Sequence, residues 1–345
     1  MAYLRVQVSP RRFLNRIALN FKSPRKRTSL SVQPVGAVLA GRSIKCRHFL
    51  LLRAPVSDRF AVLPQYLLPK QALTRFAGFV ASRERGWVTT EIIRRFVAHY
   101  QVNMAEALDA DIASYRTFND FFTRALKPGA RPLANAELVC PVDGAISQFG
   151  PIQGDQLYQA KGHTYSTTAL VGGDQALAAQ YQHGSFATIY LSPKDYHRIH
   201  MPADGRLVRM VHVPGDLFSV NPVTARGVPG LFTRNERLVC VFESARGPVV
   251  LVLVGATIVG SMATVWHGVV NAPRGKEVRA WTYPAAGQAE IELKQGDEMG
   301  RFLLGSTVVL LFPKGDLRFN PDWTPGRAVR LGEAMAGAQS GLGSA

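Results

Sequence analysis

The residues best suited to chemistry lie near the carboxyl end, where Gly305 and Ser306 interrupt an apolar, β-branched run that continues to Phe312. A packed strand gains more from a large side chain than from glycine, so the interruption indicates a bent or exposed backbone. Glycine leaves its own carbonyl unshielded, and the hydroxyl of the following serine can then reach that carbonyl. The same pair is also typical of a β-bulge or a tight turn, so the chemical interpretation needs a base for Ser306.

Two histidines, His197 and His200, lie close together in the segment SPKDYHRIHMP and are candidate bases. They are also typical of ordinary hydrogen-bonded histidines. A His-x-x-His pair occurs in metal sites, but no third ligand cluster accompanies this one, and in a strand the two rings would lie on opposite faces. We therefore expect no metal. Asp143, in the segment PVDG, is a candidate for orienting an imidazole, and its alternative role is turn formation through its own backbone.

The composition of the 345-residue chain, with 47% hydrophobic and 19% charged residues, is that of a globular protein. The net charge of +17 is unevenly distributed, because residues 1–55 hold twelve Lys or Arg and no acidic residue. Subtracting these twelve leaves +5 for the rest, a mild attraction to anionic surfaces such as lipid headgroups. The three cysteines, Cys46, Cys140 and Cys240, have no paired or metal-like spacing and are expected to be reduced thiols.

Changes in composition and hydrophobic pattern along the chain predict four segments. Residues 1–55 form a basic leader, expected to be poorly ordered, which fits either a transit peptide or a translated extension upstream of the real start. Residues 56–130 are predicted to be helical, residues 131–325 to form a β-rich domain, and residues 326–345 to be a flexible tail. The predicted fold class is therefore α+β, with amphipathic helices followed by a mostly antiparallel β-rich core.

Helical periodicity marks Lys70–Ser82, Thr89–Tyr100 and Thr117–Leu126, with Thr89 as a candidate cap of the second helix. The apolar faces either pack on the main domain or, since basic residues alternate with Phe, Leu and Trp, lie in a membrane interface. The run Val249–Val265 is a candidate membrane span, but it is barely long enough and contains glycines. Two buried strands around a glycine turn explain it better.

Taken together, these segments resemble phosphatidylserine decarboxylase of the bacterial and mitochondrial type, which cleaves itself within Leu-Gly-Ser-Thr. The resemblance runs from about residue 60 to about residue 320, and residues 1–55 fall outside it. It rests on motifs that follow one another in family order: YRTFNDFFTRALKPGARP, PVDG, QAKGHTYS, LSPKDYHRIHMP, GDLFSVNP, LFTRNERLV, VGATIVGSM, KQGDEMGRF and LGSTVVLLFP.

The resemblance implies a proenzyme that cuts itself between Gly305 and Ser306 with a triad of Asp143, His200 and Ser306. In such a triad His200 would accept the proton of Ser306 while Asp143 orients the imidazole. The family assigns a part in decarboxylation or reprotonation to the first histidine of the pair, here His197.

The products implied by the resemblance are a β chain of residues 1–305 and an α chain of residues 306–345, whose first residue becomes a pyruvoyl group. This covalently bound cofactor accepts the electrons released with carbon dioxide, as pyridoxal phosphate does in other decarboxylases. Arg198 and Lys161 are candidates for binding the phosphate or carboxylate of the substrate, and equally candidates for solvated surface charges.

The resemblance also implies that the substrate is phosphatidylserine in an anionic membrane and that the product is phosphatidylethanolamine. It implies a β-rich core related to the hybrid-barrel lipoyl and biotinyl carriers, and a homodimer. The expected location is peripheral, on the cytoplasmic face of a bacterial inner membrane, with the mitochondrial inner membrane as the alternative.

Two other classes of function remain open at this stage. A pyruvoyl-dependent decarboxylase of a soluble amino acid would share the serine chemistry but would not need the amphipathic helices. A basic nucleic-acid-binding module rests mainly on the charge of residues 1–55, and no motif of alternating aromatic and basic residues supports it. We therefore expect no nucleic-acid partner.

Overall fold

The computed structural model describes residues 62–63, 65–66, 69–257, 261–270, 275–287, 289–303 and 306–338. The basic leader predicted for residues 1–55 and Gly305 of the predicted cleavage bond lie outside the described residues. Residues 52–345 group as one compact unit, so the helical region and the β-rich region belong together.

The first described helices follow the predicted periodicity. They are α3 (Lys70–Ala81), α4 (Trp87–Tyr100) and α5 (Phe118–Phe122), with the 3-10 turns η2 (Met104–Glu106) and η3 (Ile112–Ser114) between α4 and α5. The third helix is shorter than predicted, but its start is as the sequence indicates: Thr117 caps it in a capping box with Asp120. Thr89 is not the cap of α4, which begins two residues earlier, and its hydroxyl instead accepts a hydrogen bond from the backbone N–H of Arg85 at 3.2 Å.

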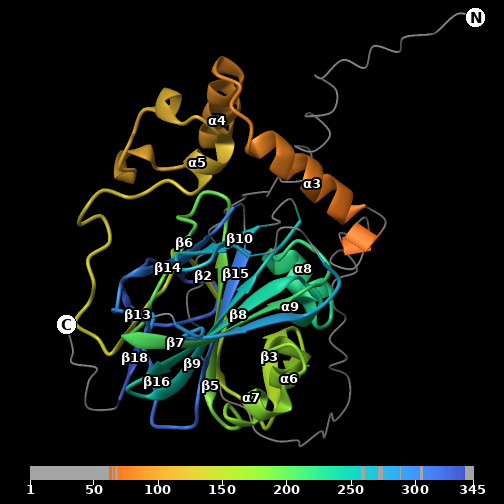
Figure 1. Cartoon of the computed structure of the whole chain (residues 1–345), viewed down its shortest axis with the longest axis vertical. Coiled ribbons are helices and arrows are strands. Elements are labelled where there is room, and N and C mark those ends of the chain that lie inside the picture. Colours follow the sequence, from red (N-terminus) through yellow and green to blue (C-terminus); the bar gives the residue numbers. More distant parts are fainter. Residues whose placement is uncertain are drawn as a thin grey trace, which may run out of the picture. The chain divides into compact units, whose positions relative to one another are not determined.

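A nine-stranded antiparallel sheet forms the centre of the β-rich region (Figure 1). Its order is β12 (Arg279–Thr282), β7 (Gly205–Val213), β8 (Arg237–Ser244), β9 (Gly247–Val254), β15 (Ser306–Phe312), β5 (Ser185–Leu191), β2 (Gly144–Pro151) and β17 (Ala328–Val329), with β13 (Glu292–Leu293) also paired to β7. β15 lies near its middle.

Three smaller antiparallel sheets accompany it. They consist of β11 (Gly268–Val269), β10 (Met262–Thr264), β14 (Glu298–Phe302) and β6 (Arg198–His200); of β1 (Leu138–Val139), β18 (Ala334–Gly337) and β16 (Arg318–Phe319); and of β3 (Gln156–Ala160) with β4 (His163–Ser166). The mostly antiparallel core is thus confirmed. Within the described parts of the chain no sheet closes into a barrel, so the relation to lipoyl carriers stays a prediction.

The middle strands of the central sheet are largely buried on both faces, which explains why β5, β8, β9 and β15 are mostly apolar in sequence. In β15, Val309 and Leu311 pack on one side, while Val308, Leu310 and Phe312 pack on the other. The first side, called here the helix-covered face, packs against α6 (Thr167–Leu170), α7 (Gln175–Ala179), α8 (Pro222–Gly227) and α9 (Leu231–Arg234). The second, called here the sheet-covered face, packs against residues of the smaller sheets such as Ile199, Met262 and Phe302.

The flexible tail predicted from residue 326 onward is wrong for most of its length. Ala328 pairs with Ala145 of β2, and Ala336 pairs with Leu138 of β1. Met335 and Ala336 are fully buried. The small residues of the tail suggested fraying. They instead pack against neighbouring strands, and their backbone hydrogen bonds are made with strands from distant parts of the chain. Residues 339–345 lie outside the described residues.

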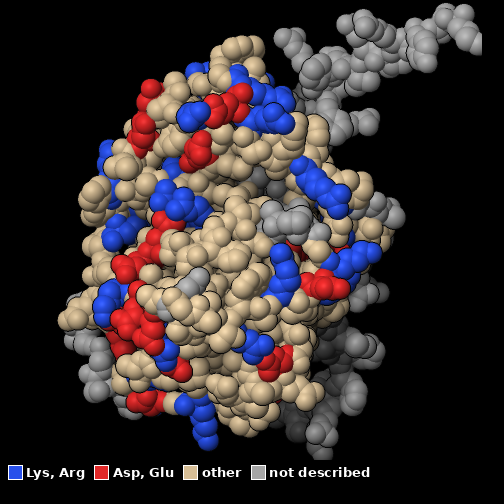
Figure 2. Space-filling view, in the orientation of Figure 1, with Lys and Arg blue, Asp and Glu red and all other residues tan. Residues whose placement is uncertain are grey.

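The run Val249–Val265 contains β9 and β10, which confirms two strands in place of a membrane span. In the described part of the chain, no helix combines the length and the apolarity needed to cross a membrane. Figure 2 shows Lys and Arg interspersed with Asp and Glu on the face in view, in keeping with the mild charge predicted for the chain after residue 55.

Candidate active site

Ser306 is the first residue of β15 and is completely buried. It pairs with Leu191 of β5, and the alternation along β15 places its side chain on the sheet-covered face, with Val308 and Leu310. Its hydroxyl has no hydrogen-bond partner among the described residues. A buried hydroxyl without a partner costs free energy, so this position is not explained by stability alone.

The loop 192–197 lies beside both flanks of the predicted cleavage bond. At its start, Leu191 pairs with Ser306. At its end, the carbonyl oxygen of His197 accepts a hydrogen bond of 3.0 Å from the backbone N–H of Phe302. The loop therefore connects the partner of Ser306 to the partner of Phe302, and it carries the first of the two candidate histidines to this point.

His197 is fully buried, and its Nδ1 lies 2.8 Å from the carbonyl oxygen of Asp195. Because a carbonyl oxygen only accepts, Nδ1 carries the proton and the lone pair is on Nε2. Nε2 has no partner among the described residues, and the ring lies 4.1 Å from the ring of Phe122. Burial lowers the pKa of His197 to about 3, which keeps the imidazole neutral at neutral pH. The side chain is thus a neutral, buried imidazole with a free basic nitrogen.

His200 has both ring nitrogens occupied. Nδ1 donates to the carbonyl oxygen of Gly296 at 2.7 Å, so Nε2 accepts from the hydroxyl of Tyr196 at 3.2 Å. Burial is the main cause that lowers the pKa of His200, against a smaller opposing effect of the hydrogen bond to Gly296. Burial also raises the pKa of Tyr196 to about 12, so its hydroxyl stays protonated and remains a donor.

Asp143 lies in the turn before β2, as the PVDG segment predicts, and is buried. Its carboxylate accepts hydrogen bonds from Nε of Arg131 at 2.9 Å, from Nη2 of Arg131 at 2.5 Å and from the backbone N–H of Leu331 at 2.9 Å. The carboxylate is therefore held by an arginine, where the triad predicted a histidine.

None of the hydrogen bonds among the described residues joins Asp143 to His200, or His200 to Ser306. Asp143 and His200 nevertheless lie near one cavity of about 320 Å³. The cavity is lined by His200 and by Arg131, which is the partner of Asp143. Ser306 does not line this cavity. The triad therefore stays a prediction, and it needs His200 to exchange at least one of its present partners.

Of the residues that surround His200, Arg198 is the one that sequence reasoning singled out. The cavity is lined by Ala125, Leu126, Lys127, Gly129, Arg131, Leu133, Tyr196, Arg198, His200, Gly296, Glu298 and Leu331. Arg131 and Tyr196 belong to motifs of the resemblance, GARP and KDYH, which is the one signal that pointed to them. Their partners come from distant segments, and no local pattern indicates them.

The two candidate anion binders differ in their surroundings. Arg198 lines the cavity, where Nη1 pairs with Glu298 at 2.8 Å and Nε donates to the carbonyl of Thr123 at 2.9 Å. Lys161 is exposed in the turn between β3 and β4 and does not line the cavity. The structure thus places Arg198 beside His200, whereas Lys161 is not part of the cavity lining.

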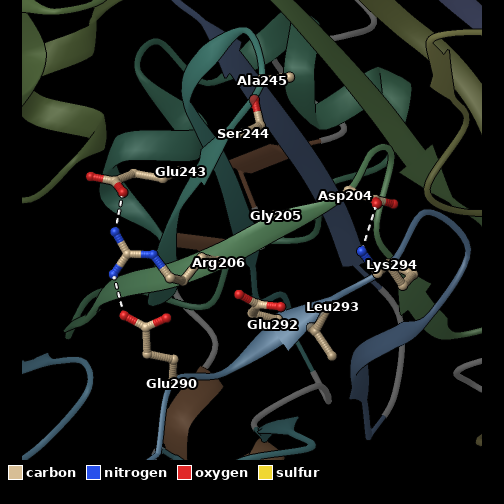
Figure 3. A pocket seen from close by; sticks show the side chains of 10 residues that line it. All are labelled: Asp204, Gly205, Arg206, Glu243, Ser244, Ala245, Glu290, Glu292, Leu293 and Lys294. Atoms are coloured by element: carbon tan, nitrogen blue, oxygen red, sulfur yellow. Dashed lines mark hydrogen bonds and ion pairs between the residues drawn. The ribbon is translucent and has the colours of Figure 1, made fainter.

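A second cavity, of about 330 Å³, is shown in Figure 3. Five of its charged side chains pair with one another: Arg206 with Glu243 and Glu290, and Lys294 with Asp204. None of the predicted site residues lines it. We therefore place the candidate active site at His197, His200 and the start of β15.

A sequence profile described as phosphatidylserine decarboxylase matches residues 118–337. That range is more than half of the chain and contains all the predicted site residues. The chain belongs to the phosphatidylserine decarboxylase family. A second profile, described as PSD, matches residues 60–101, which include α3 and α4.

Curated members of the phosphatidylserine decarboxylase family are close relatives in sequence. The phosphatidylserine decarboxylase proenzyme of Polaromonas naphthalenivorans strain CJ2 is 86% identical over 281 residues, which cover 81% of this chain and 97% of the relative. The proenzymes of Polaromonas sp. strain JS666 and Variovorax paradoxus strain S110 are 80% and 78% identical over the same length, covering 81% of this chain and 99% and 98% of the relatives. The match to nearly the whole of each relative confirms the resemblance inferred from the motifs.

Proposed function

We propose that the chain is a proenzyme that cuts itself between Gly305 and Ser306 and then decarboxylates phosphatidylserine to phosphatidylethanolamine. One observation carries the proposal: the buried hydroxyl of Ser306 has no hydrogen-bond partner among the described residues, and it lies at the first position of β15, directly after Gly305 in the sequence. Membership of a decarboxylase family, with relatives named proenzymes, supports both steps.

In the proposed cleavage, the hydroxyl oxygen of Ser306 attacks the carbonyl carbon of Gly305 while His200 takes the hydroxyl proton. The peptide C–N bond breaks as the ester C–O bond forms, and the freed amine of Ser306 takes up a proton. Loss of the α-proton of Ser306 then expels the Gly305 carboxylate and leaves a dehydroalanine. Water converts this residue to a pyruvoyl group and ammonia.

For this step His200 has to release the hydroxyl of Tyr196, because Nε2 is the nitrogen that carries the lone pair. The neutral state of the imidazole is already secured by burial, which lowers its pKa. If Gly296 continues to hold Nδ1 of His200, the ring has to change its contact at Nε2 alone. If Asp143 orients the ring directly, the hydrogen bond to Gly296 is replaced as well.

The surroundings of Ser306 fit a pyruvoyl group. The residue is fully buried, and its neighbours on the sheet-covered face, such as Leu191 and Val308, are apolar. When formed, the group supplies an electron sink for the carbon–carbon bond that breaks as carbon dioxide leaves. Exclusion of water by these neighbours favours loss of a charged carboxylate as a neutral gas.

We assign to His197 the transfer of a proton to the substrate carbon after carbon dioxide has left. Its backbone carbonyl binds Phe302, four residues before Ser306, and its buried Nε2 has no partner among the described residues. The hydrogen bond to Asp195 fixes the proton on Nδ1. Nε2 carries no proton in the neutral ring, so it first takes one up from water. With a pKa of about 3 the protonated ring then gives this proton to the substrate carbon readily and returns to its neutral form. The ring contact with Phe122 holds it in place.

The proposed partner surface is an anionic membrane, bound peripherally. Phe76 and Phe79 of α3 and Trp87 of α4 are 61%, 49% and 80% exposed, with arginines such as Arg75 and Arg83 nearby in the sequence. Exposed aromatic residues beside cations suit the interface between lipid tails and headgroups. The proposed location is the cytoplasmic face of a bacterial inner membrane, with the mitochondrial inner membrane as the alternative. The proposed oligomeric state is a homodimer.

A decarboxylase of a soluble amino acid is the second candidate. It would share the cleavage at Gly305–Ser306, but the exposed aromatic residues of α3 and α4 favour a lipid substrate. Sedimentation with phosphatidylserine vesicles separates the two, because an enzyme for a soluble substrate would remain in the supernatant.

The decisive experiment is the intact mass of the purified protein under denaturing conditions. Two species are expected, the smaller corresponding to residues 306–345 with a blocked amino terminus and lighter by one ammonia than the peptide that begins with free serine. Ser306→Ala should give a single uncut chain. A single species at full mass in the wild type, or a cut Ala variant, would overturn the proposed cleavage.

A further inference from the structure

Arg131 is a buried arginine that joins two carboxylates from different parts of the fold. Its side chain is only 8% exposed. It holds Asp143 through Nε and Nη2, and the same Nη2 lies 2.8 Å from Glu106 in the turn η2. Arg330 also approaches Glu106, at 3.5 Å. Two arginines and two carboxylates thus form one network between the helical region and the PVDG turn.

The contact between Arg131 and Asp143 is bidentate, and such a pair fixes orientation as well as charge. The hydrogen bonds with Asp143 are the largest cause that raises the pKa of Arg131, so the guanidinium keeps its charge despite burial. Burial acts to raise the pKa of Glu106, but the pairs with Arg131 and Arg330 outweigh it and lower that pKa. The guanidinium of Arg131 and the carboxylate of Glu106 are therefore charged at neutral pH.

Asp143 can accept a further donor by giving up only its longest hydrogen bond. A carboxylate offers about four acceptor positions. The oxygen Oδ1 accepts from Leu331 and from Nε of Arg131, while Oδ2 accepts from Nη2 of Arg131 and, at 3.2 Å, from Nε. Since Arg131 and His200 line the same cavity, an imidazole N–H can replace this longest bond at Oδ2, and the bonds from Nε to Oδ1 and from Nη2 to Oδ2 still hold Arg131.

We propose that Arg131 is a positioning residue for the proposed self-cleavage, which holds Asp143 ionised and oriented toward the cavity lined by His200, and which is itself fixed by Glu106. The inference rests on the proposed function, because Asp143 has this role only if the chain cuts itself. It assigns a part in maturation to a residue outside the triad.

The consequence is a defined pH dependence of maturation. Loss of the cation paired with this buried carboxylate makes its charged form less favourable. Maturation of a neutral variant should then fail at a pH at which the wild type still matures. The other ionisable groups that sense the charge of Asp143 are Arg124, Cys140, Asp195, Tyr196 and His200.

The test follows cleavage of freshly translated precursor in a cell-free system after transfer to buffers between about pH 5 and pH 9, with intact mass as the readout. Arg131→Met and Arg131→Gln should move the acidic limb of the cleavage rate upward by about 1–3 pH units. Arg131→Lys, which keeps the charge, should move it less.

Arg246→Met is the matched control. Arg246 also bridges two carboxylates, Glu137 and Asp316, but it has no contact with Asp143. The acidic limb of the cleavage rate of Arg246→Met should coincide with that of the wild type. If Arg131→Met does not fold, Arg131→Gln, which is closer to arginine in polarity, decides the outcome.

The outcomes distinguish failure of the proposed self-cleavage from failure of the positioning role of Arg131. If the wild-type precursor is not cut at any pH, the proposed function fails and the role of Arg131 falls with it. A wild type that is cut, together with neutral Arg131 variants whose acidic limb is unchanged, refutes the positioning role alone. An equal shift in Arg246→Met also refutes it, because the effect would then not depend on contact with Asp143.

Discussion

The backbone N–H of Phe302 donates a hydrogen bond of 3.0 Å to the carbonyl oxygen of His197. Phe302 lies four residues before Ser306, so this main-chain contact holds the backbone of His197 close to the segment that leads to Ser306. The imidazole takes no part in the contact. A change of the side chain at position 197 can therefore alter chemistry while the backbone beside the cleavage point keeps its pairing.

Changes at the predicted triad should stop maturation. In His200→Gln the base is absent, and in Asp143→Asn the carboxylate that holds Arg131 is lost, so we expect cleavage to slow by about 10²- to 10⁴-fold. Intact mass at successive times measures the rate. Normal maturation of either variant would remove that residue from the triad.

His197→Gln should mature but turn over slowly. The backbone contact with Phe302 persists, whereas the free Nε2 that we assign to proton transfer is lost, so we expect turnover to fall by about 10²- to 10⁴-fold. Release of labelled carbon dioxide from phosphatidylserine in detergent micelles gives the rate. His183→Gln, at an exposed histidine, is the control and should be fully active. Full activity of His197→Gln would refute the assignment.

Buried His197 should make the precursor sensitive to acid. Its pKa is about 3 when folded and about 6.5 when unfolded, so between these values the unfolded state binds more protons and stability falls as the pH falls. On a Ser306→Ala background, His197→Gln should remove up to about 1.4 kcal/mol per pH unit from this slope. Urea unfolding between about pH 4.5 and pH 6 measures it, and an unchanged slope would contradict the buried neutral imidazole.

Gly144→Ala should destabilise the turn that carries Asp143. A Cβ atom at this position would lie 2.5 Å from the carbonyl oxygen of Tyr190 and 2.9 Å from Cγ2 of Ile189, so β2 and β5 would have to separate. We expect a loss of about 1–3 kcal/mol in the free energy of unfolding. The control Gly78→Ala, in α3 with no atom within 4 Å, should stabilise by about 0.5–1 kcal/mol. Equal effects of the two changes would argue against this close contact.

The exposed aromatic residues of α3 should carry membrane binding. Phe76→Ser and Phe79→Ser each remove an apolar side chain worth about 1.5–3 kcal/mol when fully buried, so each should weaken vesicle binding by roughly 10- to 100-fold. Sedimentation with phosphatidylserine vesicles measures the affinity. Tyr158→Ser, at a similarly exposed aromatic residue on β3, is the control, and an equal loss there would indicate a non-specific effect.

Much of the fold was predictable because its signals are local. The helical spacing in Lys70–Ala81 and the cap at Thr117 follow from residues three or four positions apart. The apolar run of β15 indicated a buried strand, since a sheet covered on both faces needs no alternation with polar residues. The tail was misjudged because Ala334–Gly337 becomes a strand only through pairing with β1 and β16.

The sequence by itself determined the candidates for the site, Gly305–Ser306 for cleavage and His197, His200 and Asp143 for acid–base chemistry, because those residue types define the available chemistry. Only the tertiary structure decided what each side chain contacts. The bond between Asp143 and Leu331 joins residues 188 positions apart, and that between His200 and Gly296 joins residues 96 apart. Such contacts depend on how strands and loops pack across the whole fold, and no local pattern records them.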